Sequence, residues 1–288
     1  MTVLVNLIVT VGMLGIVPAG LRLIDPVGLR TWARFWPLAA VPGAVCLWLP
    51  RGPAATALAA LYAAAALALA ATQVPARLLR SPKRTPAARS RGPAPAEIAV
   101  LTALASPAVA AAALVAERAG YRLFGFDLDI LALTVPHFHF AGFTAALVAG
   151  LVCRAAPGPR SRQAAYSVPC GTLLVLLGYF VDDWAELAGA VVLTAGMWTV
   201  ALVTWREIRP AGRAPGVRAL FGVSAAVLAV TMALALWWAL GEAAGIVHPT
   251  LTWMAATHGL GNALGFALCA VLAWRRLSAG ASPEGAAP

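Results

Sequence analysis

The chain has 288 residues, of which 61% are apolar and only 11% are charged, and its mean hydropathy is +0.83. A soluble domain carries about a quarter charged residues, so this composition cannot cover a surface that faces water. Apolar segments long enough to cross a bilayer core of roughly 30 Å recur along the sequence. The sequence therefore predicts an all-α, polytopic transmembrane helix bundle in a lipid bilayer.

Nine membrane spans are predicted, and Lys and Arg gather beside alternate connections. All basic residues except Arg51, Arg118 and Arg122 lie on or beside the connections that follow the odd-numbered spans, or in the tail. For a protein of the plasma membrane, the positive-inside rule then places the amino terminus outside the cell and the carboxyl terminus in the cytoplasm. The net charge of +10 therefore indicates topology and attraction to anionic lipid at the cytoplasmic face, and not a nucleic-acid partner. The predicted spans are residues 2–20, 31–49, 54–72, 96–116, 128–152, 164–181, 187–204, 219–241 and 250–273.

One polar stretch divides the membrane part of the chain. Residues 73–97 are rich in Pro, Arg and Ser, which predicts a basic cytoplasmic linker. The linker separates a three-helix membrane part, residues 1–72, from a six-helix membrane core, residues 98–276. The tail, residues 277–288, is predicted to be disordered. The four cysteines show no CxxC spacing, so they predict neither a disulfide framework nor a zinc ribbon.

Two of the four histidines stand one residue apart in the apolar run LTVPHFHFAGF, residues 133–143. Ionisable residues within spans are functional by default. Pro136 removes a backbone hydrogen bond just before His137, so it kinks or unwinds the helix. On a regular helix the rings of His137 and His139 would point roughly 200° apart. Either the kink turns both rings inward, or one ring faces a site while the other makes a hydrogen bond between helices.

A second motif, THGLGNALGF, lies in the last span. At about 100° per residue, His258 and Asn262 share one small, polar stripe with Gly261 and Gly265. A dinucleotide-binding loop is excluded, because these glycines lie inside an apolar helix with no strand before it. The GxxxG spacing lets a neighbouring helix approach closely. We expect this surface to pack on the fifth span, so that His258 faces that span.

The depths of the two motifs agree. His137, His139 and His258 all lie roughly 12–17 Å below the predicted outer boundary, at 1.5 Å per residue. The sequence therefore predicts one intramembrane site that binds a transition metal (Cu, Zn or Fe) or haem through these three rings. The residues predicted to support it are Met254 as an extra ligand that favours copper, Asn262 and Thr257 around the ligating rings, and Pro136, Gly142, Gly261 and Gly265 in helix packing.

Other functions stay open at this point. Four histidines are too few for a haem-copper oxidase or a membrane di-iron desaturase. The alternative is a transporter that uses the histidines for proton coupling or substrate binding and has no cofactor. A third possibility is a purely structural membrane component. The sequence identifies neither a small-molecule ligand nor a catalytic residue.

Acidic residues favour the predicted outer side. In YFVDDWAELAG, the spacing of Asp183 and Glu186 predicts a capping pair at the start of the seventh span. A role for this group, which includes Asp182, in supporting the site or admitting protons stays open. His248 directly precedes Pro249 and is expected to be a loop residue, not a ligand.

The two histidine motifs together resemble the YndJ-like family of bacterial polytopic membrane proteins. The resemblance is carried by HFHFAGF, residues 137–143, and THGLGNALGF, residues 257–266. It implies a histidine-bearing membrane core in a bacterial plasma membrane. Members of the family are often described as transporters, and some carry an extra soluble region that this sequence is expected to lack.

Overall fold

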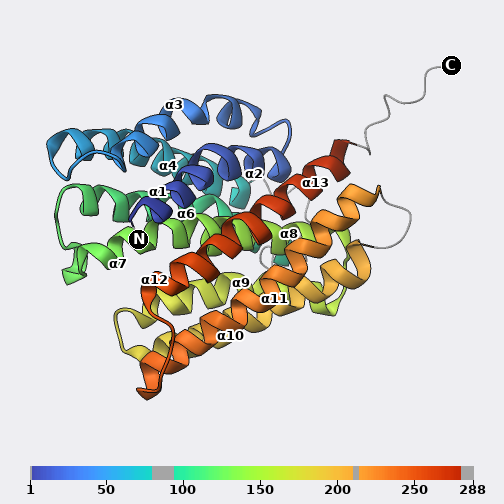
Figure 1. Ribbon diagram of the computed structural model, residues 1–288. Coiled ribbons are helices and arrows are strands. Elements are labelled where there is room, and N and C mark those ends of the chain that lie inside the picture. Colours follow the sequence, from blue (N-terminus) through green and yellow to red (C-terminus); the bar gives the residue numbers. More distant parts are fainter. Residues whose placement is uncertain (1, 80–93, 210–213, 280–288) are drawn as a thin grey trace.

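Helices make up the whole regular structure of the computed structural model, which describes residues 2–79, 94–209 and 214–279. No strand occurs in those residues, so the all-α prediction is confirmed. Nine helical segments run back and forth through the described part of the chain (Figure 1). In chain order they are α1–η1–α2 (Thr2–Val11, Gly12–Ile16, Val17–Ile24), α3 (Arg30–Cys46), α4 (Pro53–Leu79), α6 (Pro95–Arg118), α7–η3–α8 (Leu128–His137, Phe138–Thr144, Ala145–Ala155, after the short turn η2, Leu123–Gly125), α9 (Pro159–Gly178), α10–η4 (Asp183–Val203, Thr204–Ile208), α11 (Pro215–Ala244) and α12–η5–η6–α13 (Leu251–Met254, Ala255–Gly259, Gly261–Leu268, Cys269–Ala279).

Seven of these segments are long and apolar enough to cross a membrane, so the chain is a multi-pass membrane protein. The helices α3 and α9 do not meet that standard. The helix α3 has only 17 residues. The helix α9 begins with the polar run Arg160–Gln163, which lowers its apolarity. The predicted count of nine spans and the predicted orientation therefore remain predictions.

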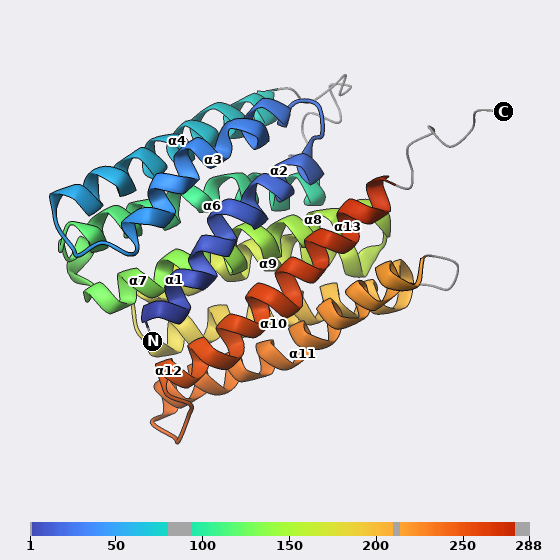
Figure 2. The ribbon, with the colours of Figure 1, turned by 45° about the horizontal axis from the view of Figure 1, so that its top comes forward.

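The bundle is built outward from α6 and the α7–η3–α8 segment (Figures 1 and 2). The α3–α4 hairpin packs against α6 on one side, and α9, α10, α11 and α13 follow on the other. The first segment contacts α3, α7 and α13, so it joins the two ends of the sequence. One continuous hydrophobic core extends from Val5 in α1 to Trp274 in α13. The predicted three-helix and six-helix parts therefore share a single core.

Within the described residues, helices extend into both ends of the predicted linker and into the start of the predicted tail. Residues 73–79 continue α4, and residues 95–97 form the first turn of α6. Residues 277–279 continue α13. The rest of both predictions, residues 80–93 and 280–288, lies outside the described residues.

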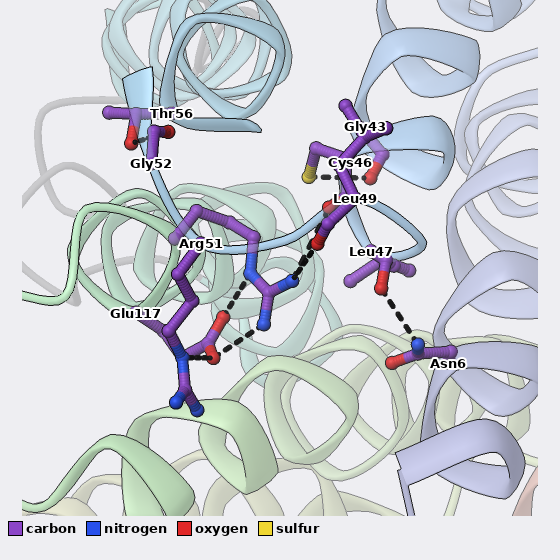
Figure 3. Close-up of polar contacts among 10 residues, drawn as sticks. Asn6, Gly43, Cys46, Leu47, Leu49, Arg51, Gly52, Thr56 and Glu117 are labelled. Atoms are coloured by element: carbon purple, nitrogen blue, oxygen red, sulfur yellow. Dashed lines mark hydrogen bonds and ion pairs between the residues drawn. The ribbon is translucent and has the colours of Figure 1, made fainter. Parts of the chain in front are cut away.

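Buried charges tie α6 to the turn between α3 and α4 at the predicted outer end (Figure 3). Glu117 is almost fully buried, and its carboxylate accepts a hydrogen bond of 2.8 Å from Nε of Arg51 and further bonds from Arg118. Arg118 also donates to the carbonyl of Leu49 at 3.2 Å. Nearby, the amide of Asn6 donates to the carbonyl of Leu47 at 2.8 Å. These bonds give the buried carboxylate its partners and satisfy carbonyl groups at the end of α3. Each such group left buried without a partner would cost about 1–3 kcal/mol.

Candidate functional site

A cavity of about 260 Å³ lies between α1, the α7–η3–α8 segment, α9, α10, α11 and the last helical segment. Its lining begins near the helix ends that share the predicted outer side, at Ile130, Glu186 and Leu251. Its deepest lining residues, such as Met197 and Phe266, lie near the middle of their helices. Most of the lining is apolar, and a few polar side chains converge on it, which is typical of small-molecule sites in proteins.

The helix that carries HxH changes its winding beside this cavity. Pro136 cannot donate a backbone hydrogen bond, and the π-helical segment η3 begins two residues later at Phe138. The hydroxyl of Thr144 donates to the carbonyl of His139 at 2.8 Å, five residues earlier, and this contact helps to satisfy the rewound backbone. The last span contains two further π-helical segments, η5 and η6, and residues of both line the same cavity. Such segments occur frequently at functional sites.

His139 points away from the cavity and is completely buried. Its Nδ1 lies 2.7 Å from the carbonyl of Val135, so Nδ1 carries the proton and donates. Its Nε2 then accepts the hydrogen bond from the Tyr62 hydroxyl, also 2.7 Å away. The two rings lie nearly parallel, with centroids 5.9 Å apart. Both nitrogens of His139 are therefore occupied by the contact between η3 and α4.

His137 lines the cavity wall. Its ring meets the edge of Phe138, and no hydrogen-bond partner reaches it within the described part of the chain. A polar ring that faces an apolar cavity without a partner is costly, and a bound molecule or water in the cavity can supply that partner. Of the HxH pair, His137 alone is available to a ligand.

His258 also lines the cavity, and two residues, Thr231 and Asn262, fix its ring. Its Nδ1 donates to the carbonyl of Thr231 in α11 at 2.7 Å. The amide of Asn262 lies 3.1 Å from its Nε2 and donates to it, while Asn262 Oδ1 accepts a bond of 2.7 Å from the Thr231 hydroxyl. The three side chains form a closed network between α11 and the last span, which holds His258 in one tautomer.

The glycine stripe of the last span faces a different helix from the one predicted. A Cβ on Gly261 would lie 2.9 Å from Thr231, and one on Gly265 would lie 2.7 Å from Val227, so both glycines pack on α11. The prediction that this surface packs on the fifth span is therefore wrong. The last span does contact the fifth span, through η6 and η3. Gly142 of the fifth span instead packs on Ser106 of α6.

Two of the predicted supporting residues occupy different surroundings. Met254 lines the cavity together with Met197 and Met232, which the sequence gave no reason to connect with it. The Thr257 hydroxyl donates to the carbonyl of Trp253 in its own helix at 2.8 Å and does not reach a histidine nitrogen.

The acidic group at the start of α10 is arranged differently from the prediction. The cap is Asp182, whose carboxylate accepts a bond of 2.8 Å from the backbone N–H of Ala185, so the predicted capping pair of Asp183 and Glu186 is displaced by one residue. Glu186 is therefore not needed for capping. It lines the cavity, as does Tyr179 at the end of α9.

His248 lies in the connection between α11 and α12, as the loop prediction requires. Its Nε2 lies 3.0 Å from a carboxylate oxygen of Glu242. Its ring meets Trp238, which lines the cavity, edge to face. His248 is therefore a neighbour of the cavity and not part of its lining.

The described residues contain no group of three or more His, Cys, Asp or Glu side chains arranged to hold a metal ion. His137 and His258 share one cavity, whereas His139 belongs to the contact with Tyr62. The geometry therefore brings together two of the three histidines that the sequence connects.

The fold and the cavity define a multi-pass α-helical membrane protein with a mostly apolar internal site. The family model described as YndJ-like protein matches residues 7–266. The chain therefore belongs to the YndJ-like protein family. Neither the comparison with curated proteins nor that with solved structures finds a match.

Proposed function

We propose that the protein binds a small, largely apolar molecule within the membrane, as the binding step of a transporter that needs no bound metal. His137 meets the polar group of that molecule. The cavity lining begins at the predicted outer end of the bundle and extends to the middle of the helices. The molecule therefore reaches the cavity from the outer side or the outer leaflet.

The observation that carries this proposal is the contrast between the three histidines that lie within the helical bundle. His139 and His258 have hydrogen-bond partners at both ring nitrogens, supplied by the protein itself. His137 borders the same cavity as His258 and has no such partner within the described residues. A polar group left free in an apolar cavity provides orientation and specificity for a ligand.

Cavity filling tests the proposal directly. The protein is reconstituted in lipid nanodiscs, and binding of 4-phenylbutanol is measured by equilibrium dialysis against empty nanodiscs. Ala190 lines the cavity from α10, whereas Ala195 lies on an exposed face of the same helix. We expect saturable binding to the wild type and to Ala195→Trp, and a loss of about tenfold or more for Ala190→Trp.

Equal binding to both Trp variants, or only unsaturable partitioning into lipid, would overturn the proposal. If Ala190→Trp does not insert, Ala235→Phe fills the same cavity from α11. The thermal unfolding midpoint of each variant without ligand shows whether the fold is retained.

A soft metal ion, Cu(I), is the second candidate ligand. The thioethers of Met197, Met232 and Met254 line the cavity that also contains His137. Thioether and imidazole groups favour copper over hard cations. A three-histidine site for zinc or iron, or a haem site that uses His139, would first have to break the bond to Tyr62.

Elemental analysis distinguishes the two candidates. Protein purified from copper-supplemented cells and washed with a mild chelator is expected to retain about one copper per chain if Cu(I) is the ligand, and Met254→Leu would reduce that content. Leu260→Met, a change outside the cavity lining, serves as the control. Copper far below stoichiometry would exclude this candidate and leave the small-molecule proposal intact.

A further inference from the structure

The outer end of the cavity holds a carboxyl group that has no basic partner. Glu186 lines the cavity from the first turns of α10, and Tyr179, which directly follows α9, lines the same cavity. The two helices approach closely here, because a Cβ on Gly178 would lie 2.5 Å from the Cα of Glu186. This close packing fixes Glu186 at the cavity wall.

Other acidic side chains lie near Glu186, and no basic side chain pairs with it in the described residues. The carboxylates of Asp183 and Glu242 lie close enough to act on it electrostatically. None of the ion pairs within the described residues includes Glu186, and the nearby imidazole of His248 contacts Glu242 instead. The cavity lining, which lies wholly in the described part of the chain, contains no Lys or Arg and has Glu186 as its one acidic residue.

This arrangement is unexpected in a chain with a net charge of +10. At the same predicted outer end, Arg51 and Arg118 are engaged by Glu117, and Arg122 is engaged by Asp127. The basic residues of that end therefore pair with other carboxylates and leave Glu186 without a basic partner. An ionised carboxylate in a mostly apolar cavity is costly without a counter-ion, and a bound cation would relieve that cost.

We propose that the ligand of this cavity is an amphiphilic organic cation, that is, a protonated amine on a compact apolar body. The ammonium group pairs with Glu186 and lies beside the rings of Tyr179 and Trp238, while the apolar body occupies the deeper cavity towards His137. Aromatic rings next to a carboxylate are a common setting for ammonium recognition. The inference rests on the proposed function, since it names the class of molecule that the same cavity binds.

Three probes of equal length and different charge test it: 4-phenylbutylamine, 4-phenylbutanol and 4-phenylbutyrate. Binding is measured by equilibrium dialysis with the protein in nanodiscs of zwitterionic lipid, and the signal from Ala190→Trp nanodiscs is subtracted. The wild type is expected to bind the amine about tenfold or more tightly than the alcohol, and the acid weakest, since a hydrogen-bonded charge pair carries that difference.

The variant Glu186→Gln is expected to remove the preference for the amine and to bind the alcohol as the wild type does. Glu207→Gln neutralises an exposed carboxylate at the other end of the same helix and is the matched control, which should retain the preference. If Glu186→Gln does not insert, the order of the three probes on the wild type still decides the question.

The outcomes separate this inference from the proposed function. Equal binding of amine and alcohol would overturn the cation inference and leave a neutral-ligand cavity. Tighter binding of the acid would do the same. Failure of all three probes to bind saturably would overturn the proposed function and the inference together.

Discussion

The Tyr62 hydroxyl and the His139 ring are joined by a buried hydrogen bond of 2.7 Å that ties α4 to η3. The bond from Nδ1 of His139 to the carbonyl of Val135 fixes the tautomer that makes this contact possible. It also explains the spacing of the HxH motif. One ring holds two helices together, and the other, His137, is left at the wall of the cavity.

Tyr62→Phe is the first prediction. It leaves Nε2 of His139 buried without a donor, so the free energy of unfolding should fall by about 1–3 kcal/mol. Chemical denaturation in mixed micelles measures the loss. Tyr166→Phe removes a hydroxyl from a largely exposed tyrosine on α9 and should change stability very little. Similar stability of the two variants would mean that the Tyr62–His139 bond contributes nothing to the fold.

Much of the fold could be predicted from the sequence because hydropathy and helix ends are local properties. The predicted fifth span, residues 128–152, corresponds closely to the helical segment Leu128–Ala155. The linker prediction was too wide because Pro75 is tolerated inside α4, where composition alone predicts an interruption. The predicted sixth span, residues 164–181, left out the polar first turns of α9, and these turns lower the mean hydropathy of the whole helix.

The second prediction concerns the close contact between Gly265 and Val227. A methyl group added by Gly265→Ala would lie 2.7 Å from a Val227 methyl, so overpacking should lower stability by about 1–3 kcal/mol. Adding Val227→Ala removes the obstructing methyl groups and should restore part of that loss. Gly15→Ala is the control, because nothing lies within 4 Å of its added Cβ. If the effects of Gly265→Ala and Val227→Ala on stability were simply additive, α11 and the last span would not be in contact at these two residues.

The candidate site was only partly predictable, because its partners come from distant segments. Tyr62 lies in an Ala-rich span that carries no motif, although a lone tyrosine in such a span was the available signal. Thr231 in α11 likewise stands in no motif that would predict its contact with His258. The spacing of Gly261 and Gly265 could not show which helix packs on them, since a GxxxG pair indicates close approach but does not identify the neighbouring helix. The sequence did not reveal the role of Glu186, because the N-cap of α10 lies one residue earlier than the capping pattern indicates.

The third prediction is the orientation of the chain. In a cysteine-free background, Tyr121→Cys should react with an impermeant thiol reagent added to intact cells, because the positive-inside rule places its loop outside. Arg160→Cys should react only after the cells are opened. Both positions are exposed at opposite ends of the bundle. The reverse pattern of labelling would place the cavity mouth on the cytoplasmic side.

The fourth prediction concerns anionic lipid at the predicted cytoplasmic face. The exposed side chains of Arg22, Arg30 and Arg34 surround one shallow pocket. Native mass spectrometry should show that the wild type retains phosphatidylglycerol and that the double variant Arg30→Gln/Arg34→Gln retains less, since each basic group near the surface contributes about 1 kcal/mol. Arg122→Gln, at the other end, should behave as the wild type. Unchanged retention by the double variant would refute this lipid contact.

The central claim is that His137, and not His139, borders a cavity reached from the predicted outer side. The most direct measurement compares His137→Cys and His139→Cys in the cysteine-free background, labelled from outside with a small, cationic methanethiosulfonate reagent. His137→Cys should react and be protected by 4-phenylbutylamine, whereas His139→Cys should stay unreactive, because its position is completely buried against Tyr62. Reaction at His139→Cys with none at His137→Cys, or equal reaction at both, would contradict the account.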